Sequence, residues 1–164
     1  IVRILPEGDE SGGIQISEKH IIVKAGNTVI FSGLLEGQFL RYENTISSPQ
    51  KNILTVKVAE LAESVDRVTP VVNEKLKNPL HMKFDDGDIT ISYISSTAKA
   101  KDLCYYEGNC EPLEIGISNK FLSDVLRAIP DETCEICLST KGAPMTIRQA
   151  KGTDYIYVIA LMKI

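Results

Sequence analysis

The chain has 164 residues, of which 43% belong to the hydrophobic set and 24% are charged, and its formal net charge at pH 7 is −4. This apolar content with so little net charge excludes a disordered chain, and no apolar run reaches the roughly 18 residues of a membrane-spanning helix. Four cysteines are too few for a disulfide-stapled secreted module of this length, so a cytoplasmic protein with reduced cysteines is expected.

The first residue is Ile1, and neither an initiator Met nor a signal sequence precedes it. We therefore expect the chain to be part of a longer protein. The segment Ile1–Leu5 is expected to be the end of a helix that starts before it.

The first third of the chain reads as short strands. Ile14–Ile16 alternates apolar and polar residues, His20–Lys24 does so more loosely, and Thr28–Ser32 is a short apolar run before Gly33. Ala25–Asn27 between two of these runs predicts a hairpin turn, because Gly and Asn tolerate positive φ.

Two amphipathic helices follow, each with one apolar stripe and one polar face. The first is expected around Ala59–Val68 and the second over Asn119–Ile129, where Ser118 or Asn119 is the N-cap and Pro130 ends the helix. Each helix is expected to lie on a sheet with its polar face open.

Each helix is followed by a predicted hairpin. The first joins Leu80–Phe84 to Ile89–Ile94, and the second joins Cys134–Leu138 to Met145–Arg148. The chain closes with the apolar run Tyr155–Met162, which has no helix signals and predicts a buried strand.

An internal repeat appears when the two helical stretches are overlaid with a shift of 61 residues. The apolar positions then coincide. The coinciding pairs are Leu54 with Ile115, Val56 with Ile117, Leu61 with Leu122, Val65 with Leu126, and Val68 with Ile129. The pattern predicts an α+β fold of repeated β-α-β-β-β units, 52–111 and 112–164, with two helices packed on one face of curved antiparallel sheets.

Four motifs in this order resemble the bacterial DNA polymerase III beta subunit, the sliding clamp. Pro112–Ile129 resembles that family's Glu-Ile-Gly-Phe-Asn signature and the helix after it, and Val72–Lys75 resembles its Ser-Asn-Glu-Lys. Leu35–Tyr42 is similar to its Leu-Glu-Gly-Arg-Phe-Pro-Asp-Tyr, and Tyr155–Ile164 occupies the place of its closing strand.

The resemblance implies the DNA-clamp fold and a fragment of the clamp. Residues 1–48 would be the C-terminal half of the middle domain, and 49–164 would be the whole C-terminal domain. Such clamps are homodimeric rings of six like domains, with helices lining the hole. The implied function is that of a replicase processivity factor, without catalysis or a cofactor, that encircles double-stranded DNA non-specifically. The implied partners are the DNA polymerase III alpha subunit, the clamp loader and other proteins with clamp-binding motifs; no membrane is involved.

The family binds partner peptides in a groove, and motif matching carries this groove onto both domains. Leu40, Asn44 and Ala160–Lys163 depart from the family's residues there. The implied groove residues are Phe39, Leu40, Asn44, Thr45, Phe121, Gly142, Pro144, Val158, Ala160, Leu161, Met162 and Lys163.

Two further surfaces are expected. Non-specific sliding needs cationic side chains on exposed helix faces, which Arg3, Arg67, Lys120 and Arg127 could supply, or these residues are simply solvated. Motif matching places the apolar pair Pro70 and Val71 at the dimer interface. Because the N-terminal domain is missing, we expect these 164 residues alone to form no ring.

Metal and catalytic sites are weakly indicated by the remaining motifs. Cys134 and Cys137 form a CxxC, but in a strand they should point to opposite faces, with Cys134 inward and Cys137 outward, which argues against zinc. Asp85–Asp88 is too short for a calcium loop. Neither histidine belongs to a triad, and there is no Gly-rich phosphate loop, so an enzyme is a weaker alternative.

A third hypothesis is a clamp-like paralogue that binds partner peptides but is not loaded on DNA. Its motivation is the altered C-terminus together with the first helix, whose polar face carries three acidic residues, Glu60, Glu63 and Asp66.

Overall fold

The structure is a computed structural model that describes residues 12–38, 42–46, 51–76, 78–139 and 143–164. The chain divides into two compact units, Ile1–Arg41 and Tyr42–Ile164. Each unit is described by itself below.

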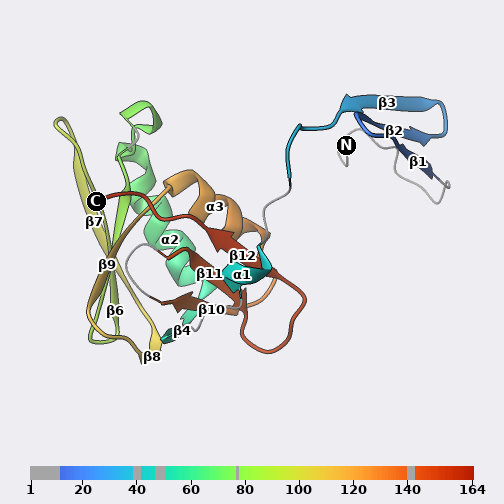
Figure 1. The fold of residues 1–164 in the computed structure, drawn as a ribbon. Coiled ribbons are helices and arrows are strands. Elements are labelled where there is room, and N and C mark those ends of the chain that lie inside the picture. Colours follow the sequence, from blue (N-terminus) through green and yellow to red (C-terminus); the bar gives the residue numbers. More distant parts are fainter. Residues whose placement is uncertain (1–11, 39–41, 47–50, 77, 140–142) are drawn as a thin grey trace. The chain divides into compact units, whose positions relative to one another are not determined.

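The described part of the first unit is one antiparallel sheet in the order β1-β2-β3, made of β1 (Gly12–Ile16), β2 (His20–Ala25) and β3 (Thr28–Gly33) (Figure 1). The predicted hairpin turn is confirmed, and Gly26 has a φ of 53° there. The register places Ile14 opposite Val23 on one apolar face. Ile14 is nevertheless 68% exposed, so this face is open within the described part of the unit.

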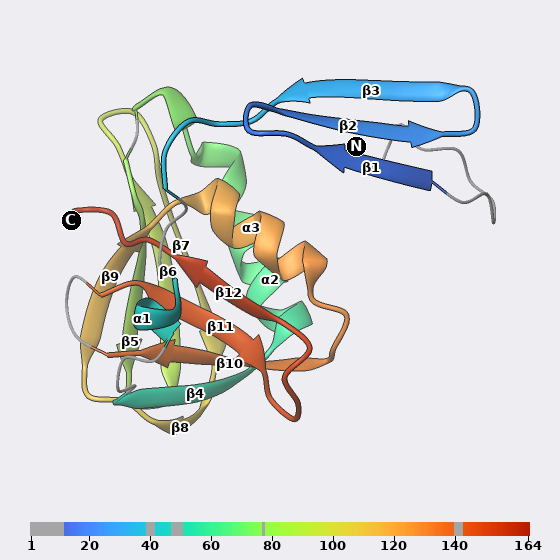
Figure 2. The same cartoon turned by 45° about the vertical axis from the view of Figure 1, so that its right-hand side comes forward.

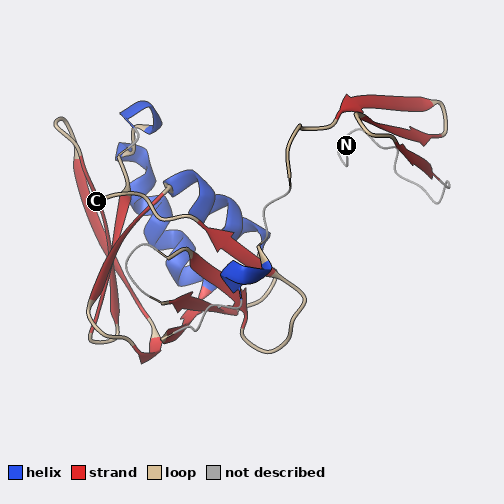
Figure 3. Ribbon diagram, viewed as in Figure 1, coloured by secondary structure: helices blue, strands red, loops and turns tan. Residues whose placement is uncertain are grey.

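The second unit contains the two predicted repeats, each a strand, a helix and three strands (Figure 3). The first repeat comprises β4 (Asn52–Lys57), α2 (Val58–Val68), β5 (Leu80–Asp85), β6 (Asp88–Ile94) and β7 (Lys99–Tyr105). The second repeat comprises β9 (Leu113–Ile117), α3 (Asn119–Ala128), β10 (Thr133–Leu138), β11 (Met145–Gln149) and β12 (Ile156–Ile159).

The two repeats exchange their first strands. The second repeat's β9 joins the first repeat's strands in a sheet of order β7-β6-β5-β9. Strand β4 joins the second repeat's strands in the order β12-β11-β10-β4-β8, where β8 is the short edge strand Glu107–Asn109. All of these pairings are antiparallel. Neither repeat can therefore complete its sheet without the other.

The two helices lie side by side and cover the inner faces of the sheets (Figures 1 and 2). Helix α3 begins after Ser118, whose Oγ accepts a hydrogen bond from the backbone N–H of Phe121 at 3.4 Å, as predicted for an N-cap. Their apolar stripes enter one core, which contains all ten residues of the overlaid repeat pairs. The repeat is thus a repeat of core positions.

The repeats differ most in the connection that follows the helix. From α2 to β5 the chain covers residues 69–79 and forms the short helices η1 (Thr69–Val71) and η2 (Glu74–Leu76). From α3 to β10 it covers only residues 129–132. The longer connection contains Pro70 and Val71, so the first repeat has a surface that the second repeat lacks.

Several details differ from the sequence expectations. The closing strand is shorter than the expected Tyr155–Met162, because only Ile156–Ile159 pairs with β11. The short elements α1 (Glu43–Ile46) and β8 (Glu107–Asn109) were not predicted. Both elements are too short for a periodic pattern of apolar residues to predict them.

Cys137 was expected to face outward, but its side chain is buried. Cys137 does lie on the face opposite Cys134 and Ile136, but it is 1% exposed. Helix α1 lies beside β10 and β11 on this outer side of the sheet in both views (Figures 1 and 2). Both faces of this sheet are therefore partly covered, which strand alternation alone could not reveal.

Within the described ranges, no helix is long and apolar enough to cross a membrane.

Candidate partner groove and helical surface

The last residues of the chain line an open cleft beside β9. After β12 the chain crosses to the other sheet, where the backbone N–H of Met162 donates to the carbonyl of Gly116 at 2.8 Å. The cleft has a volume of about 470 Å³. Its lining consists of Glu114, Ile115, Gly116, Leu161, Met162, Lys163 and Ile164.

Three of the expected groove residues, Leu161, Met162 and Lys163, meet in this cleft. Sequence reasoning missed the four other lining residues, Glu114–Gly116 and Ile164. The alternation of apolar and polar residues in β9 does not predict that these residues line a cleft, because the C-terminal tail that forms the other wall is distant in sequence. Leu161 also packs against the core.

Other expected groove residues lie elsewhere in the second unit. Val158 on β12 is 39% exposed, and Phe121 in the first turn of α3 is 57% exposed. Ala160 is exposed and Pro144 is half-buried. The exposed side chains of Val158, Phe121 and Ala160 are available for contact.

For the remaining expected groove residues the structure does not describe the side chains. Phe39, Leu40 and Gly142 lie outside the described residues, as does Arg3 of the expected DNA-facing set. Asn44 and Thr45 form part of α1, whose backbone is described.

Thr146 on β11 is a buried polar residue beside Val158, one of the expected groove residues. It lies opposite Val158 in the register and is 3% exposed. Its Oγ1 is buried and has no hydrogen-bond partner among the described residues. A buried hydroxyl without a hydrogen-bond partner lowers the stability of the fold. Here that hydroxyl lies in the sheet beside the exposed apolar residue Val158.

The cationic residues of the two helices differ in their surroundings. Lys120 is exposed, and Arg127 is exposed with its Nη2 4.0 Å from Oδ1 of Asp66. At this distance and exposure the contact is weak. Both side chains can therefore reach solvent from α3.

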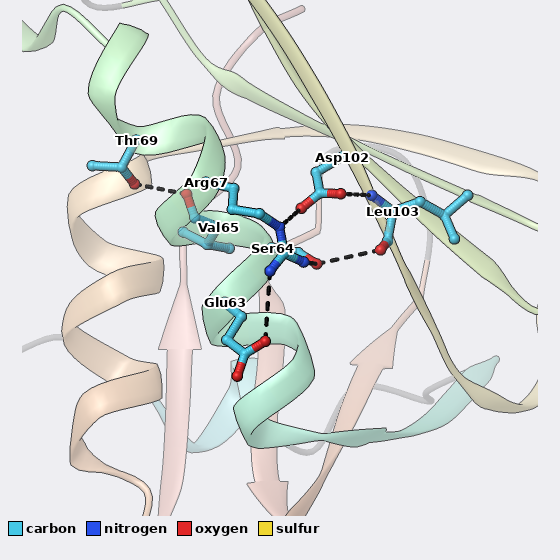
Figure 4. A network of polar contacts seen from close by, with 7 residues as sticks. All are labelled: Glu63, Ser64, Val65, Arg67, Thr69, Asp102 and Leu103. Carbon is cyan, nitrogen blue, oxygen red and sulfur yellow. Dashed lines mark hydrogen bonds and ion pairs between the residues drawn. The ribbon is translucent and has the colours of Figure 1, made fainter.

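Arg67 on α2 is engaged with its neighbours (Figure 4). Its Nε donates a short hydrogen bond to Oδ2 of Asp102, its Nη2 donates to Oγ of Ser64 at 3.1 Å, and its Nη1 lies 3.5 Å from Oε2 of Glu63. The guanidinium thus ties α2 to strand β7. Glu60 on the same helix is paired with Lys57 at 2.8 Å.

The charge state of Asp102 follows from these contacts. Burial of this carboxyl by itself raises its pKa, but the hydrogen bonds from Arg67 and from the backbone N–H of Leu103 outweigh burial and lower the pKa below its usual value. Asp102 is therefore ionised at neutral pH, and it neutralises the charge that Arg67 would offer to a phosphate.

Pro70 and Val71, the expected interface pair, lie in η1. Pro70 is exposed, while Val71 is half-buried and packs against the core. The pair therefore forms an apolar edge in which Pro70 is exposed and Val71 is fixed by its contacts with the core.

The cysteines have the properties of core residues. Burial raises the pKa of the Cys134 thiol to about 12 and that of Cys104 to about 11, so both are protonated at neutral pH. In the described part of the chain, no group of three His, Cys, Asp or Glu side chains could hold a metal ion.

Comparison with known proteins gives a consistent result. Residues 45–163 match the family model "DNA polymerase III beta subunit, C-terminal domain". The beta sliding clamps of Pseudomonas aeruginosa and Haemophilus influenzae are each 26% identical over 165 aligned positions, which cover 100% of this chain and 45% of the relative. The chain thus spans less than half the length of these curated relatives.

The solved structures agree. The DNA polymerase III subunit beta of Pseudomonas aeruginosa aligns with a TM-score of 0.84 at 26% identity, covering 99% of this chain and 45% of that one. A structure of the same organism's sliding clamp bound to griselimycin aligns with a TM-score of 0.80 at 26% identity and covers 99% and 44% of the two chains. With its exchanged repeats and paired helices, this chain belongs to the DNA polymerase III beta subunit family, the sliding clamps, and carries that family's C-terminal domain.

Proposed function

We propose that this chain is the C-terminal part of a replication clamp that encircles duplex DNA and holds a polymerase on it. In this proposal residues 49–164 are the last domain of each subunit, and residues 1–48 are the end of the middle domain. The supporting observation is the pair of repeats with exchanged strands, which puts α2 and α3 together on the inner faces of both sheets. Such a domain can offer helices to DNA while its sheets form a rim.

The proposed mechanism requires no chemical step. A closed ring around DNA cannot dissociate sideways, so processivity comes from topology, and the inner surface needs only weak, non-specific contacts with phosphates. Lys120 and Arg127 on α3 are the described residues best suited to this role, because both are exposed.

The proposed tethering site is the apolar surface around the C-terminal tail. Met162 in the cleft and the exposed Val158 support it, since a flexible thioether accommodates varied apolar anchors at little cost. Clamp-binding peptides of the replicative polymerase, the clamp loader and repair proteins are the proposed ligands.

This site is tested by fluorescence polarisation with a labelled clamp-binding peptide. We expect Met162→Ala and Val158→Ala each to weaken binding, and Leu76→Ala, which removes an exposed side chain from η2, to leave it unchanged. Competition by griselimycin, which the Pseudomonas aeruginosa clamp binds, provides a second readout. Unchanged affinity in both groove variants would refute the assignment.

A clamp-like paralogue that binds peptides but is not loaded on DNA is the second candidate. It is favoured by α2, where Glu60, Glu63 and Asp66 share the helix with one arginine, and that arginine contacts Asp102 and Glu63. Loading of the full-length protein on nicked circular DNA separates the candidates: retention on the circle and release on linearisation support the clamp.

We also propose that the ring closes through the apolar edge at Pro70 and Val71, against the N-terminal domain of a second subunit. The longer connection of the first repeat, in which both residues lie, supports this assignment. Sedimentation of the full-length protein tests it, because Val71→Glu should then shift the dimer towards the monomer.

A further inference from the structure

A small cavity lies between the neighbouring helices α2 and α3. Its volume is about 20 Å³. A single water molecule needs roughly 10–15 Å³ of such space, together with about two to four polar partners. Each helix contributes three lining residues, which are Ala62, Val65 and Asp66 of α2 and Ser123, Leu126 and Arg127 of α3. The cavity is therefore large enough for one water molecule, provided that polar groups reach it.

Ser123 supplies a polar group on the inner side of this cavity. The residue is only 8% exposed, and its Oγ is buried with no hydrogen-bond partner among the described residues. A serine inside a helix often donates to the carbonyl four residues earlier, but Ser123 and Asn119, both described, form no such bond. Because an unpaired buried hydroxyl lowers stability, a partner within the cavity is favoured.

Asp66 and Arg127 supply the other polar groups. Oδ1 of Asp66 and Nη2 of Arg127 are 4.0 Å apart, and both side chains are exposed. A direct N–H···O hydrogen bond spans roughly 2.7–3.2 Å, so this pair is too far apart to form one. A separation of this size between two polar groups is typical of a contact that a water molecule bridges.

The sequence places these groups around one space. Asp66 follows Ala62 by four residues and Arg127 follows Ser123 by four, so each pair shares one face of its helix. Ala62 and Ser123 are the small side chains of the lining, and a larger side chain at either position would fill the cavity. The space and its polar rim therefore have a common origin in these two spacings.

We infer that one water molecule is bound between α2 and α3, where Ser123 holds it and where it bridges Arg127 to Asp66. The water accepts a hydrogen bond from the guanidinium, donates one to the carboxylate, and forms its third with Oγ of Ser123. Arg127 is thereby held at the contact between the helices without a direct ion pair. DNA plays no part in this site, so a chain that is never loaded on DNA holds the same water.

A high-resolution crystal structure of this chain tests the site directly. We expect electron density for one water molecule within hydrogen-bond distance of Ser123 Oγ, and we expect Ser123→Ala to remove it. A wild-type structure without this density, in which Ser123 Oγ turns to the carbonyl of Asn119, overturns the site.

A double-mutant cycle of Ser123→Ala and Asp66→Ala supplies a readout in solution, because the helix propensities of the two single changes cancel in it. Once one change has broken the bridge, the other has less to remove. We expect the double variant to be less destabilised than the product of the single effects on the unfolding equilibrium constant, by at least about twofold. The control cycle uses Glu63→Ala, an exposed residue of α2 outside the cavity lining, and should show no coupling. Negligible coupling in both cycles overturns the bridge.

The mobility of Arg127 provides a third readout, which a purely structural role of Ser123 would not change. The NMR order parameter of the Arg127 Nε–H group should fall in Ser123→Ala, because the guanidinium loses the water that holds it. Glu63→Ala should leave that order parameter at the wild-type value. An Arg127 side chain that is equally rigid in Ser123→Ala and in the wild type contradicts the bridge.

Discussion

Met162 and Gly116 are joined by a backbone hydrogen bond of 2.8 Å that fastens the C-terminal tail to β9. A Cβ on Gly116 would lie 2.9 Å from the carbonyl oxygen of Met162 and 2.9 Å from Cβ of Pro79. The tail can approach so closely only because this position has no side chain. The shape of the candidate cleft therefore depends on a residue that contributes no side chain to it.

Gly116→Ala is expected to displace the tail and to destabilise the protein by about 1–3 kcal/mol, because the new methyl group has no space. Urea unfolding measures the loss, and the methyl resonance of Met162 should shift. Gly33→Ala is the control, since a Cβ there meets nothing within 4 Å. Equal stability of the two variants would contradict the close contact.

Leu61 and Leu122 occupy equivalent places in the two repeats, and both are fully buried. Replacing either by Ala should lower the free energy of unfolding by about 2–5 kcal/mol, because each leaves a cavity in the shared core. We expect similar costs for the two, measured by urea unfolding, with the 98% exposed Leu35→Ala as control. A small cost at one site would mean that the repeats are not equivalent in packing.

Asp102→Asn is expected to destabilise the protein by about 1 kcal/mol at pH 7, because it weakens the hydrogen bonds that hold α2 to β7. The folded-state pKa of Asp102 is lowered, so its stabilisation is complete above the unfolded pKa of about 3.9 and is lost as the pH falls through the folded value. Urea unfolding at pH 7 and at acid pH should show the difference between wild type and variant disappear.

The matched control for this change is Asp124→Asn on α3, an exposed position with no ion pair among the described residues. Its effect should be small at both pH values. A wild type and Asp102→Asn variant of equal stability at pH 7 would show that the Arg67 contact adds nothing to the fold.

Lys120 and Arg127 should carry the DNA contacts of this domain, whereas Arg67 should not. In the full-length protein, K120E/R127E is expected to weaken duplex binding and to reduce the slope of log affinity against log salt by about two. Arg67→Ala should leave that slope nearly unchanged, because its guanidinium already contacts Asp102 and Glu63. A large effect of Arg67→Ala would mean that DNA displaces these carboxylates.

The periodicity of the sequence was sufficient to predict both long helices and the hairpins, and the family was predicted from the resemblance of four motifs. Helix α3 was predicted to within a residue, because its stripe, its N-cap Ser118 and Pro130 are all local signals. Of the residues that line the cleft, the sequence named Leu161–Lys163 but not Gly116. The place of Gly116 in the cleft comes from its contact with Met162, which is distant in the chain.

By itself the sequence determined the repeat and its core, because amphipathic periods and turn residues act over a few neighbouring positions. Only the tertiary structure decided that the repeats exchange β4 and β9, that Arg67 meets Asp102 35 residues away, and that Oγ of Ser64 donates to the carbonyl of Leu103 39 residues away. Such contacts follow from how a helix crosses a sheet, and no local pattern encodes that crossing.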